Sequence, residues 1–295
     1  MNEINEKLQA LRIGFIGAGR LGCALAWSLV DRDLGVVAVA SLVEADATRL
    51  AGRIAGCEVM SMQEVANSAN LVFVTTPDEA IGPTVAQIAW RPDNAAVHCS
   101  GVTEVTALAS AARAGAMIGG FHPMQTFGDP MAAVRSLPGC TITIEADEPL
   151  LTTLSGIAER LQCRINRLPP GMRGRYHAAA GYTSQFINAL FAEAVRIWQS
   201  WGATEDEAVR ALLPLAKGTL SSIESAGIVN GMPGPVSRGD VGSIEKHVAA
   251  LSKMPPDVME FYRVVCDRTI GLGMRRGAID EEKAARLRSI LSSPK

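Results

Sequence analysis

The chain has 295 residues, which is enough for two domains of ordinary size. Hydrophobic residues make up 48% of it and charged residues 20%, a composition that excludes a disordered chain. The net charge of −2 offers no electrostatic attraction for nucleic acid or an anionic membrane, so we expect a small-molecule partner.

The N-terminal segment and the cysteines favour a cytoplasmic protein. The first residues are polar and carry no signal-peptide charge pattern, and no run approaches the ~20 apolar residues of a membrane span. The six cysteines are scattered, without a CxxC pair or a His/Cys cluster at metal-ligand spacing. We therefore expect reduced thiols, no metal site and no contact with a membrane.

A short apolar strand over residues 13–16 leads into the glycine-rich run Gly17-Ala18-Gly19-Arg20-Leu21-Gly22. This GxGxxG spacing at a strand-to-helix turn is typical of dinucleotide-binding sites. Gly17 allows the tight turn, Gly19 lets the backbone approach a pyrophosphate, and Gly22 lets the following helix pack against the sheet. The helix that begins near Arg20 presents unpaired N–H groups to the anion. An ordinary strand-to-helix turn is the alternative interpretation.

The end of the second predicted strand, Val36–Ser41, decides which dinucleotide we expect. NAD-binding domains place an Asp or Glu there for the ribose 2′-hydroxyl, and this carboxylate would repel a 2′-phosphate. Here Ser41 stands at the strand end, and Arg20 and Arg49 are near enough in sequence to meet a phosphate. We therefore expect NADP (as NADPH) rather than NAD. Two alternatives stay open: Glu44 curls back to the ribose, or Arg20 is a solvated helix-start residue.

Further apolar runs predict strands that alternate with helices, with strands over 58–60, 71–75, 95–101, 116–121 and 140–144 and helices over 62–66 and 150–161. This alternation is typical of a doubly wound parallel sheet, an α/β fold that binds its ligand at the carboxyl ends of the strands. Thr75-Thr76-Pro77 ends the fourth strand, so we expect it beside the nicotinamide ribose; a simple turn is the alternative. In the fifth strand, alternation predicts His98 and Ser100 on one face and Cys99 on the other.

The proline-containing segment 164–171 is the expected domain boundary. We assign residues 1–168 to an N-terminal Rossmann domain and residues 169–295 to an all-α C-terminal domain. Small and apolar residues recur at steps of four and three from Tyr176 to Trp201, which predicts one long helix with a continuous packing seam. Further helices are expected over 208–225, 248–269 and 281–291. The seam favours a homodimer through this domain, although an intramolecular core would give the same pattern.

A turn over residues 231–240, rich in glycine and proline, interrupts these helices and presents Arg238 and Asp240. One interpretation is an interhelical loop with a surface ion pair, which contributes little stability. The other interpretation is an anion-binding or active-site loop that faces the cofactor cleft.

Five segments in this order give the chain a resemblance to the bacterial family of Rossmann-like proteins with a C-terminal domain of unknown function 2520: Gly17–Gly22, His98-Cys99-Ser100-Gly101, Phe121–Phe127, Tyr176-His177-Ala178-Ala179 and Gly234–Asp240. The resemblance implies an NADP-type Rossmann domain. It also implies a helical C-terminal domain similar to those of 6-phosphogluconate dehydrogenase and pyrroline-5-carboxylate reductase, which typically dimerises. It supplies no known substrate.

Two details of the resemblance concern the site. Family members often have Ser-Arg at the end of the second strand, where this chain has Ser41-Leu42. The segment Gly119–Met124 is similar to the His-Pro-Met segment of prephenate dehydrogenases, whose histidine takes part in substrate chemistry. By this analogy His122 is a catalytic candidate.

The candidate site residues combine proton transfer with carboxylate binding. His122 is the candidate general acid or base, because histidine titrates nearest neutral pH. Arg238 is expected to bind a substrate carboxylate through its planar guanidinium and Asp240 to orient a neighbour, while His177 and Ser100 complete a polar wall. The other two histidines have structural interpretations that compete with a role in the site. His98 could be a buried core residue, and His247 could be an exposed helix residue.

We therefore predict an NADP-dependent oxidoreductase that transfers hydride between the nicotinamide and a small, carboxylate-bearing carbonyl, imine or alcohol substrate. The helix over 176–201 has no lysine, whereas β-hydroxyacid dehydrogenases place a catalytic lysine on the corresponding helix. The alternatives are an NADP(H)-binding sensor without turnover and a methyltransferase.

Overall fold

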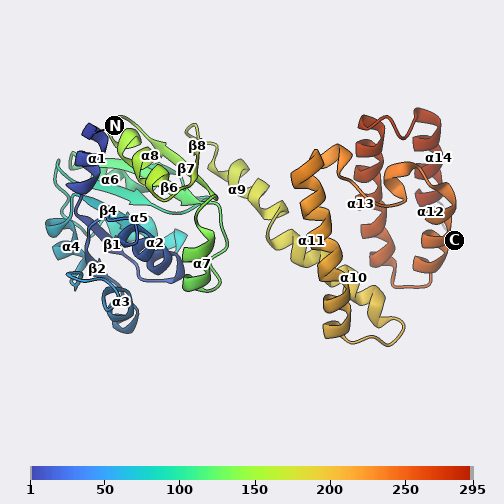
Figure 1. Cartoon of the computed structure of the whole chain (residues 1–295), viewed down its shortest axis with the longest axis horizontal. Helices are drawn as coiled ribbons and strands as arrows, with labels where there is room; N and C mark the ends of the chain where they lie inside the picture. Colours follow the sequence, from blue (N-terminus) through green and yellow to red (C-terminus); the bar gives the residue numbers. More distant parts are fainter. Residues whose placement is uncertain (1, 293–295) are drawn as a thin grey trace. The chain divides into compact units, whose positions relative to one another are not determined.

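The computed structural model describes residues 2–292 (Figure 1). Its contacts divide the chain into two compact units, one that ends at Ser184 and one that begins at Gln185. The predicted boundary at residue 168 falls before helix α9 (Arg173–Tyr182), which belongs to the first unit. The candidate residues that α9 carries are therefore part of the first unit.

The first unit is built on one eight-stranded sheet, with strands β1 (Ile13–Ile16), β2 (Val36–Ala40), β3 (Glu58–Val59), β4 (Leu71–Val74), β5 (Ala95–His98), β6 (Met117–Pro123), β7 (Thr141–Ala146) and β8 (Arg164–Arg167). Their order across the sheet is β3-β2-β1-β4-β5-β6-β7-β8. The strand order reverses between β1 and β4, and open α/β sheets bind ligands at such a switch point. The glycine turn follows β1 and therefore lies at this point.

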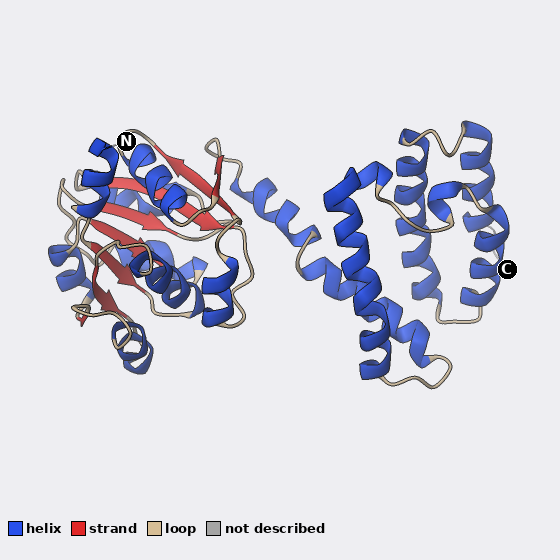
Figure 2. Ribbon diagram, in the orientation of Figure 1, coloured by secondary structure: helices blue, strands red, loops and turns tan. Residues whose placement is uncertain are grey.

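Helices cover both faces of the sheet (Figure 2). One hydrophobic core lies under α1 (Asn2–Gln9), α2 (Arg20–Val30), α3 (Glu44–Ala51), α7 (Pro130–Ser136) and α8 (Leu150–Arg160). The core on the other face lies under α4 (Met62–Ser68), α5 (Ile81–Val85) and α6 (Ala109–Arg113), near the short 3-10 helices η1 (Asp78–Ala80) and η2 (Val105–Leu108). The predicted α/β Rossmann architecture is confirmed.

The sheet differs from the prediction at its far edge. β7 runs antiparallel to β6, with Phe121 opposite Ile144. A parallel pair would need a long crossover that carries the chain back to the opposite end of the sheet. Between β6 and β7 the chain forms α7, which packs beside α2, and it re-enters the sheet at the end where β6 leaves it. Residues 164–167, which lie in the expected boundary segment, form β8, which is parallel to β7 because α8 supplies the crossover. β5 ends at His98, so Ser100 lies in a loop rather than in the predicted strand.

The second unit is helical, as predicted, with α10 (Gln185–Gln199), α11 (Glu205–Asn230), η3 (Val236–Arg238), α12 (Val241–Leu251), α13 (Pro256–Arg275) and α14 (Glu281–Ser292). Its hydrophobic core gathers residues of α12, α13 and α14, among them Ile244, Ile270 and Leu287. The hairpin of α10 and α11 contributes little to this core. Val195 and Ala208 are the buried residues of these two helices within the described chain.

Two predicted helices are broken in the structure. The helix expected from Tyr176 to Trp201 is divided into α9 and α10, because the hydroxyls of Thr183 and Ser184 both donate to the carbonyl of Ala180 and compete with the helical pattern. The helix expected over 248–269 is divided into α12 and α13. Pro255 and Pro256 lack N–H groups and restrict the preceding residue, so the chain restarts there with proline in the first turn.

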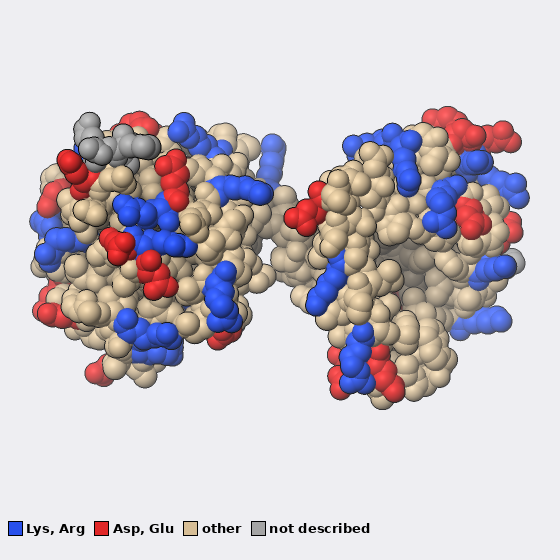
Figure 3. All heavy atoms as spheres, in the orientation of Figure 1, with Lys and Arg blue, Asp and Glu red and all other residues tan. Residues whose placement is uncertain are grey.

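The surface agrees with the small net charge. Figure 3 shows basic and acidic side chains interspersed on the visible face of each unit rather than gathered by sign. Among residues 2–292, the helices are too short or too polar to span a membrane.

Candidate active site and dinucleotide cleft

The glycine turn after β1 has the geometry that its sequence predicts. Gly17 adopts a φ of 108°, and a Cβ on it would lie 2.7 Å from the backbone of Thr75. A Cβ on Gly22 would lie 2.5 Å from the Gly17 carbonyl oxygen, so only glycine lets α2 pack this closely. At Gly19 a Cβ would meet no described atom within 4 Å. The turn is therefore closed toward the protein and open at Gly19, where an anion can approach the N-terminus of α2.

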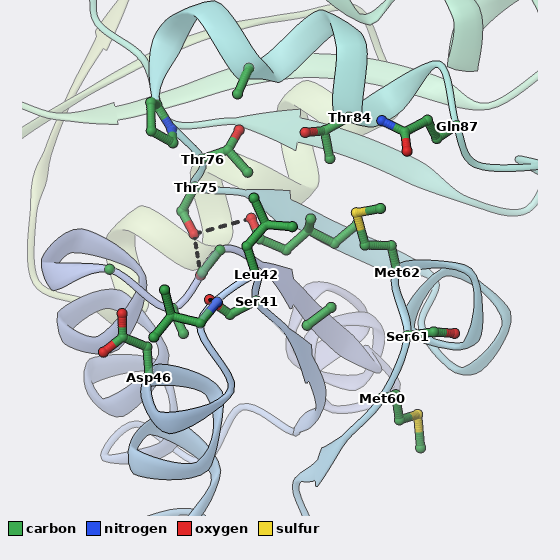
Figure 4. A pocket seen from close by; sticks show the side chains of 18 residues that line it. Ser41, Leu42, Asp46, Met60, Ser61, Met62, Thr75, Thr76, Thr84 and Gln87 are labelled. Atoms are coloured by element: carbon green, nitrogen blue, oxygen red, sulfur yellow. Dashed lines mark hydrogen bonds between the residues drawn. The ribbon is translucent and has the colours of Figure 1, made fainter.

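A cavity of about 620 Å³ begins at this turn and runs to the carboxyl end of β2 (Figure 4). Ser41, Leu42 and Asp46 line one side of it, and Met60 and Met62 line another. The Leu42 side chain is 101% exposed. The size and the largely apolar lining suit the adenosine half of a dinucleotide.

Neither of the two arginines predicted to meet a 2′-phosphate lines this cavity. Arg49 donates to the Asp46 carboxylate at 2.7 Å and to the Ala18 carbonyl at 3.3 Å. Arg20 lines the neighbouring cavity. Among the described residues that line this first cavity, one is charged, Asp46.

A second cavity, of about 500 Å³, continues from the first toward β5. The two cavities share Gly19 and the segment Thr75-Thr76-Pro77, so they form one cleft along the carboxyl ends of the strands. Ser100 and Cys99 both line this part, and Cys99 also belongs to the hydrophobic core under α2 and α8. The Thr76 hydroxyl oxygen is buried and has no hydrogen-bond partner among the described residues, as expected for a group that meets a ligand.

His122, at the end of β6, meets two residues of α9. Its Nδ1 lies 2.6 Å from the Tyr176 hydroxyl, and the Tyr176 and His177 rings pack edge-on to the imidazole, with centroids 5.5 and 6.2 Å away. A Cβ on Gly101 would lie 2.9 Å from the other ring nitrogen, Nε2. The structure thus brings His122 and His177 together beside the loop that contains Ser100.

Burial is the main cause that lowers the pKa of His122 to about 4, with smaller contributions from the neighbouring His177 and Arg173 and an opposing one from Asp78. His122 is therefore neutral at neutral pH. An unfolded histidine titrates near pH 6.5, so between pH 6.5 and 4 the unfolded chain binds a proton that folded His122 does not. The free energy of unfolding therefore has its full value above pH 6.5 and decreases as the pH falls toward 4.

Sequence reasoning missed the residue that holds this region together, Arg173. Its side chain is fully buried, Nε donates to the Glu145 carboxylate at 2.6 Å, and Nη1 donates to the Ser100 carbonyl at 2.7 Å. Nη2 occupies the place where a Cβ on Gly120 would be. The signal was the Gly119-Gly120 pair within an apolar strand, because a strand glycine often marks a close approach of another group.

The structure favours the core interpretation of His98. Its side chain is fully buried and its Nδ1 accepts from the Ser100 N–H at 3.2 Å. Burial, with help from Arg173 and His122, lowers its pKa to about 3, so it is neutral.

Arg238 and Asp240 belong to the second unit. Arg238 lies in η3 and is exposed. Asp240 caps α12: its carboxylate accepts from the backbone N–H and the hydroxyl of Ser243, and these bonds lower its pKa. His247 lies on α12, exposed, with Nδ1 2.8 Å from the Tyr262 hydroxyl.

Solved structures similar to the whole chain include three informative ones. A "putative NADP oxidoreductase", BF3122 from Bacteroides fragilis, is 25% identical with a TM-score of 0.70, over 90% of this chain and 99% of that chain. Protein TM1727 from Thermotoga maritima is 22% identical with a TM-score of 0.74, again over 90% of this chain and 99% of that chain. A reductive aminase from Aspergillus terreus in complex with NADPH is 16% identical with a TM-score of 0.62, over 95% and 99%. The latter two likenesses show the fold.

Sequence comparison is more specific about the family. No curated protein matches the chain. A Rossmann-like domain model matches residues 2–123, and the domain of unknown function DUF2520 matches residues 140–269. The chain therefore consists of a Rossmann-like domain followed by a DUF2520 domain, as its five motif segments predict.

Proposed function

We propose that the chain is an NADP(H)-dependent oxidoreductase that transfers hydride to or from a small carbonyl, imine or alcohol substrate. The observation that carries the proposal is the continuous cleft from the glycine turn to Ser100. One end suits a nucleotide, and the other lies beside the loop that His122 contacts. The likeness to the B. fragilis protein described as a "putative NADP oxidoreductase" supports the same activity.

The residues of the cleft fit a dinucleotide. Gly19 and the N-terminal N–H groups of α2 would hold the pyrophosphate, the end of β2 at Ser41 the adenosine, and Thr75-Thr76-Pro77 the nicotinamide ribose. When bound, the nicotinamide supplies or accepts the hydride. The unpartnered Thr76 hydroxyl gives the ribose a hydrogen-bonding group that the protein itself does not use.

His122 is the proposed proton-transferring group. Because it is neutral, it acts as an N–H donor to a substrate oxygen or nitrogen, or as a base in the reverse direction, and not as an imidazolium. Arg238 is proposed as the ligand of a substrate carboxylate on the strength of its exposed planar guanidinium. The hydrogen bonds of Asp240 to Ser243 favour a capping role over the predicted orienting role.

The proposal is tested by titrating the protein with NADPH and with NADH and following nucleotide fluorescence. We expect saturable binding of both, with NADPH bound more tightly. Hydride exchange is then sought on a panel of small oxo acids, imines and hydroxy acids. Tighter NADH binding would contradict the NADP assignment, and tight NADPH binding without exchange on any compound would favour the sensor alternative.

We also propose that the chain forms a homodimer through α10 and α11. An apolar groove of about 340 Å³ lies between these helices, lined by Ile187, Leu190, Phe191, Ala194, Leu212, Leu215, Ala216, Thr219 and Leu220. Leu215 is 66% exposed and Leu220 55%. Monomeric proteins seldom expose an apolar surface of this kind, and a second copy of the same hairpin offers a self-complementary cover.

Leu215→Lys should convert this dimer to a monomer, because a lysine ammonium cannot be desolvated against an apolar partner surface. The measurement is molar mass by light scattering over a range of protein concentrations. Arg286→Glu, an exposed change on α14, is the matched control and should stay dimeric. A wild-type protein that is monomeric at all concentrations would refute the dimer.

A further inference from the structure

One face of the sheet is polar where Arg173, Tyr176 and His177 of α9 meet it. On β6 and β7, Phe121, Ile142 and Ile144 point into the core under α8. Because side chains alternate along a strand, His122 and Thr143 point to the opposite face. They are opposite each other in the ladder, and Asn166 of β8 is next to Thr143. A row of three polar side chains thus crosses three neighbouring strands.

These side chains form a hydrogen-bonded chain that ends at the imidazole. The Asn166 Nδ2 donates to the Thr143 hydroxyl at 3.1 Å. The Thr143 hydroxyl in turn faces Tyr176 and acts to lower the pKa of Tyr176, against the larger effect of burial. The Tyr176 hydroxyl lies 2.6 Å from His122 Nδ1.

The first donor favours one direction for the whole chain. Since Thr143 accepts from Asn166, its own proton is available for the Tyr176 oxygen, and the Tyr176 proton is then available for Nδ1 of His122. An imidazole that accepts at Nδ1 carries its proton on Nε2 when it is neutral.

We propose that Thr143 and Tyr176 are positioning residues that hold His122 in a single neutral form, with Nδ1 as the acceptor from Tyr176 and the proton on Nε2. The Nε2 atom faces Gly101, where a Cβ would lie 2.9 Å away, in the loop that follows the cavity-lining residue Ser100. The N–H bond is thereby directed toward the loop side of the cleft.

The charges around His122 agree with a neutral imidazole. On α9, Arg173 and His177 face it and disfavour an added positive charge, and the Arg173 guanidinium is itself paired with Glu145 of β7. On β5, His98 is buried and neutral, and Asp78 at the start of η1 acts to raise the pKa of His122. Burial raises the pKa of Tyr176, so its hydroxyl is protonated in the resting protein and can donate to Nδ1.

The use of this arrangement in catalysis rests on the function proposed above. When hydride transfer places negative charge on a substrate oxygen or nitrogen, the Nε2–H bond breaks and a new O–H or N–H bond forms. The Tyr176 proton moves to Nδ1, which keeps the imidazole neutral. The resulting tyrosinate is stabilised by the Thr143 hydroxyl and the charge of Arg173, and it regains its proton from water.

The test uses the full-length protein without nucleotide, with isotope-labelled histidine and long-range proton–nitrogen NMR. The His122 signals are assigned from the spectrum of His122→Gln. In the wild type at neutral pH we expect one neutral form with the proton on Nε2. Tyr176→Phe should produce a mixture of both neutral forms and raise the pKa of His122 by about 0.5–1 unit, since a hydrogen bond to the neutral form is lost. Thr143→Val, of similar shape, should change the pKa in the same direction by less.

The control is Tyr182→Phe, an exposed tyrosine at the end of the same helix, which should leave the His122 signals unchanged. A wild-type His122 with its proton on Nδ1, or a Tyr176→Phe spectrum equal to that of the wild type, would overturn the proposal. Because no nucleotide or substrate is present, this result is independent of whether the chain proves to be an oxidoreductase.

Discussion

Replacing Arg173 by methionine should lower the free energy of unfolding by about 3–5 kcal/mol, the usual cost of removing one partner from a buried ion pair. The substitution leaves the Glu145 carboxylate, whose side chain is 10% exposed, without its counter-charge. It also leaves the Ser100 carbonyl without its donor. Arg173 joins α9 to β7 and to the loop after β5, so we expect the packing of Tyr176 on His122 to loosen as well.

Urea unfolding, followed by circular dichroism, measures this effect. Arg175→Met is the matched control: Arg175 lies on the same helix and is exposed, so its replacement should change the stability by no more than about 0.5 kcal/mol. The double replacement of Arg173 and Glu145 by methionine should recover part of the loss, because it removes both buried charges. An equal loss for Arg173→Met and Arg175→Met would show that the buried pair contributes nothing.

The sequence was sufficient for features that depend on local pattern. The apolar strand before Gly17, the glycine spacing and the polar ends of β4 and β5 predicted the dinucleotide cleft, because each depends on residues close together in the chain. β8 was missed because the Arg164–Arg167 strand is edge-exposed and polar, so it lacks the apolar run of a buried strand. The direction of β7 depends on the short connection through α7. The spacing of apolar residues within a strand does not indicate the direction in which that strand runs.

The site was harder to predict than the fold, since its properties arise from long-range contacts. The motif pointed to His122 as a proton-transferring residue but not to its charge, which depends on burial and on Arg173, a residue distant in sequence. Arg173 itself is an ordinary polar residue in the sequence, and only the space left by Gly120 shows that it is buried. The break between α9 and α10 was missed because the small and apolar residues continue at helical spacing across it. The signal for the break is the pair of adjacent hydroxyl residues, Thr183 and Ser184, which bond to the Ala180 carbonyl.

Gly19→Ala should weaken NADPH binding about 10- to 100-fold while the protein keeps its fold. The backbone of Gly19 is extended, with a φ of −69°, and a Cβ there would meet no described atom within 4 Å, so the protein itself can accept alanine. The added methyl would instead occupy the space that the proposed pyrophosphate needs. An overpacked contact costs about 1–3 kcal/mol, and each 1.4 kcal/mol corresponds to about a tenfold change in Kd.

Two other glycines separate this effect from general damage. Gly17→Ala places a Cβ 2.7 Å from the Thr75 backbone at a φ of 108°, so it should lower the melting temperature as well as the affinity. Gly174→Ala, in an open and exposed position of α9, should alter neither nucleotide affinity nor fold. If Gly19→Ala binds NADPH as tightly as the wild type and is equally stable, the open side of the turn does not contact the cofactor, and the pyrophosphate must be assigned elsewhere in the cleft.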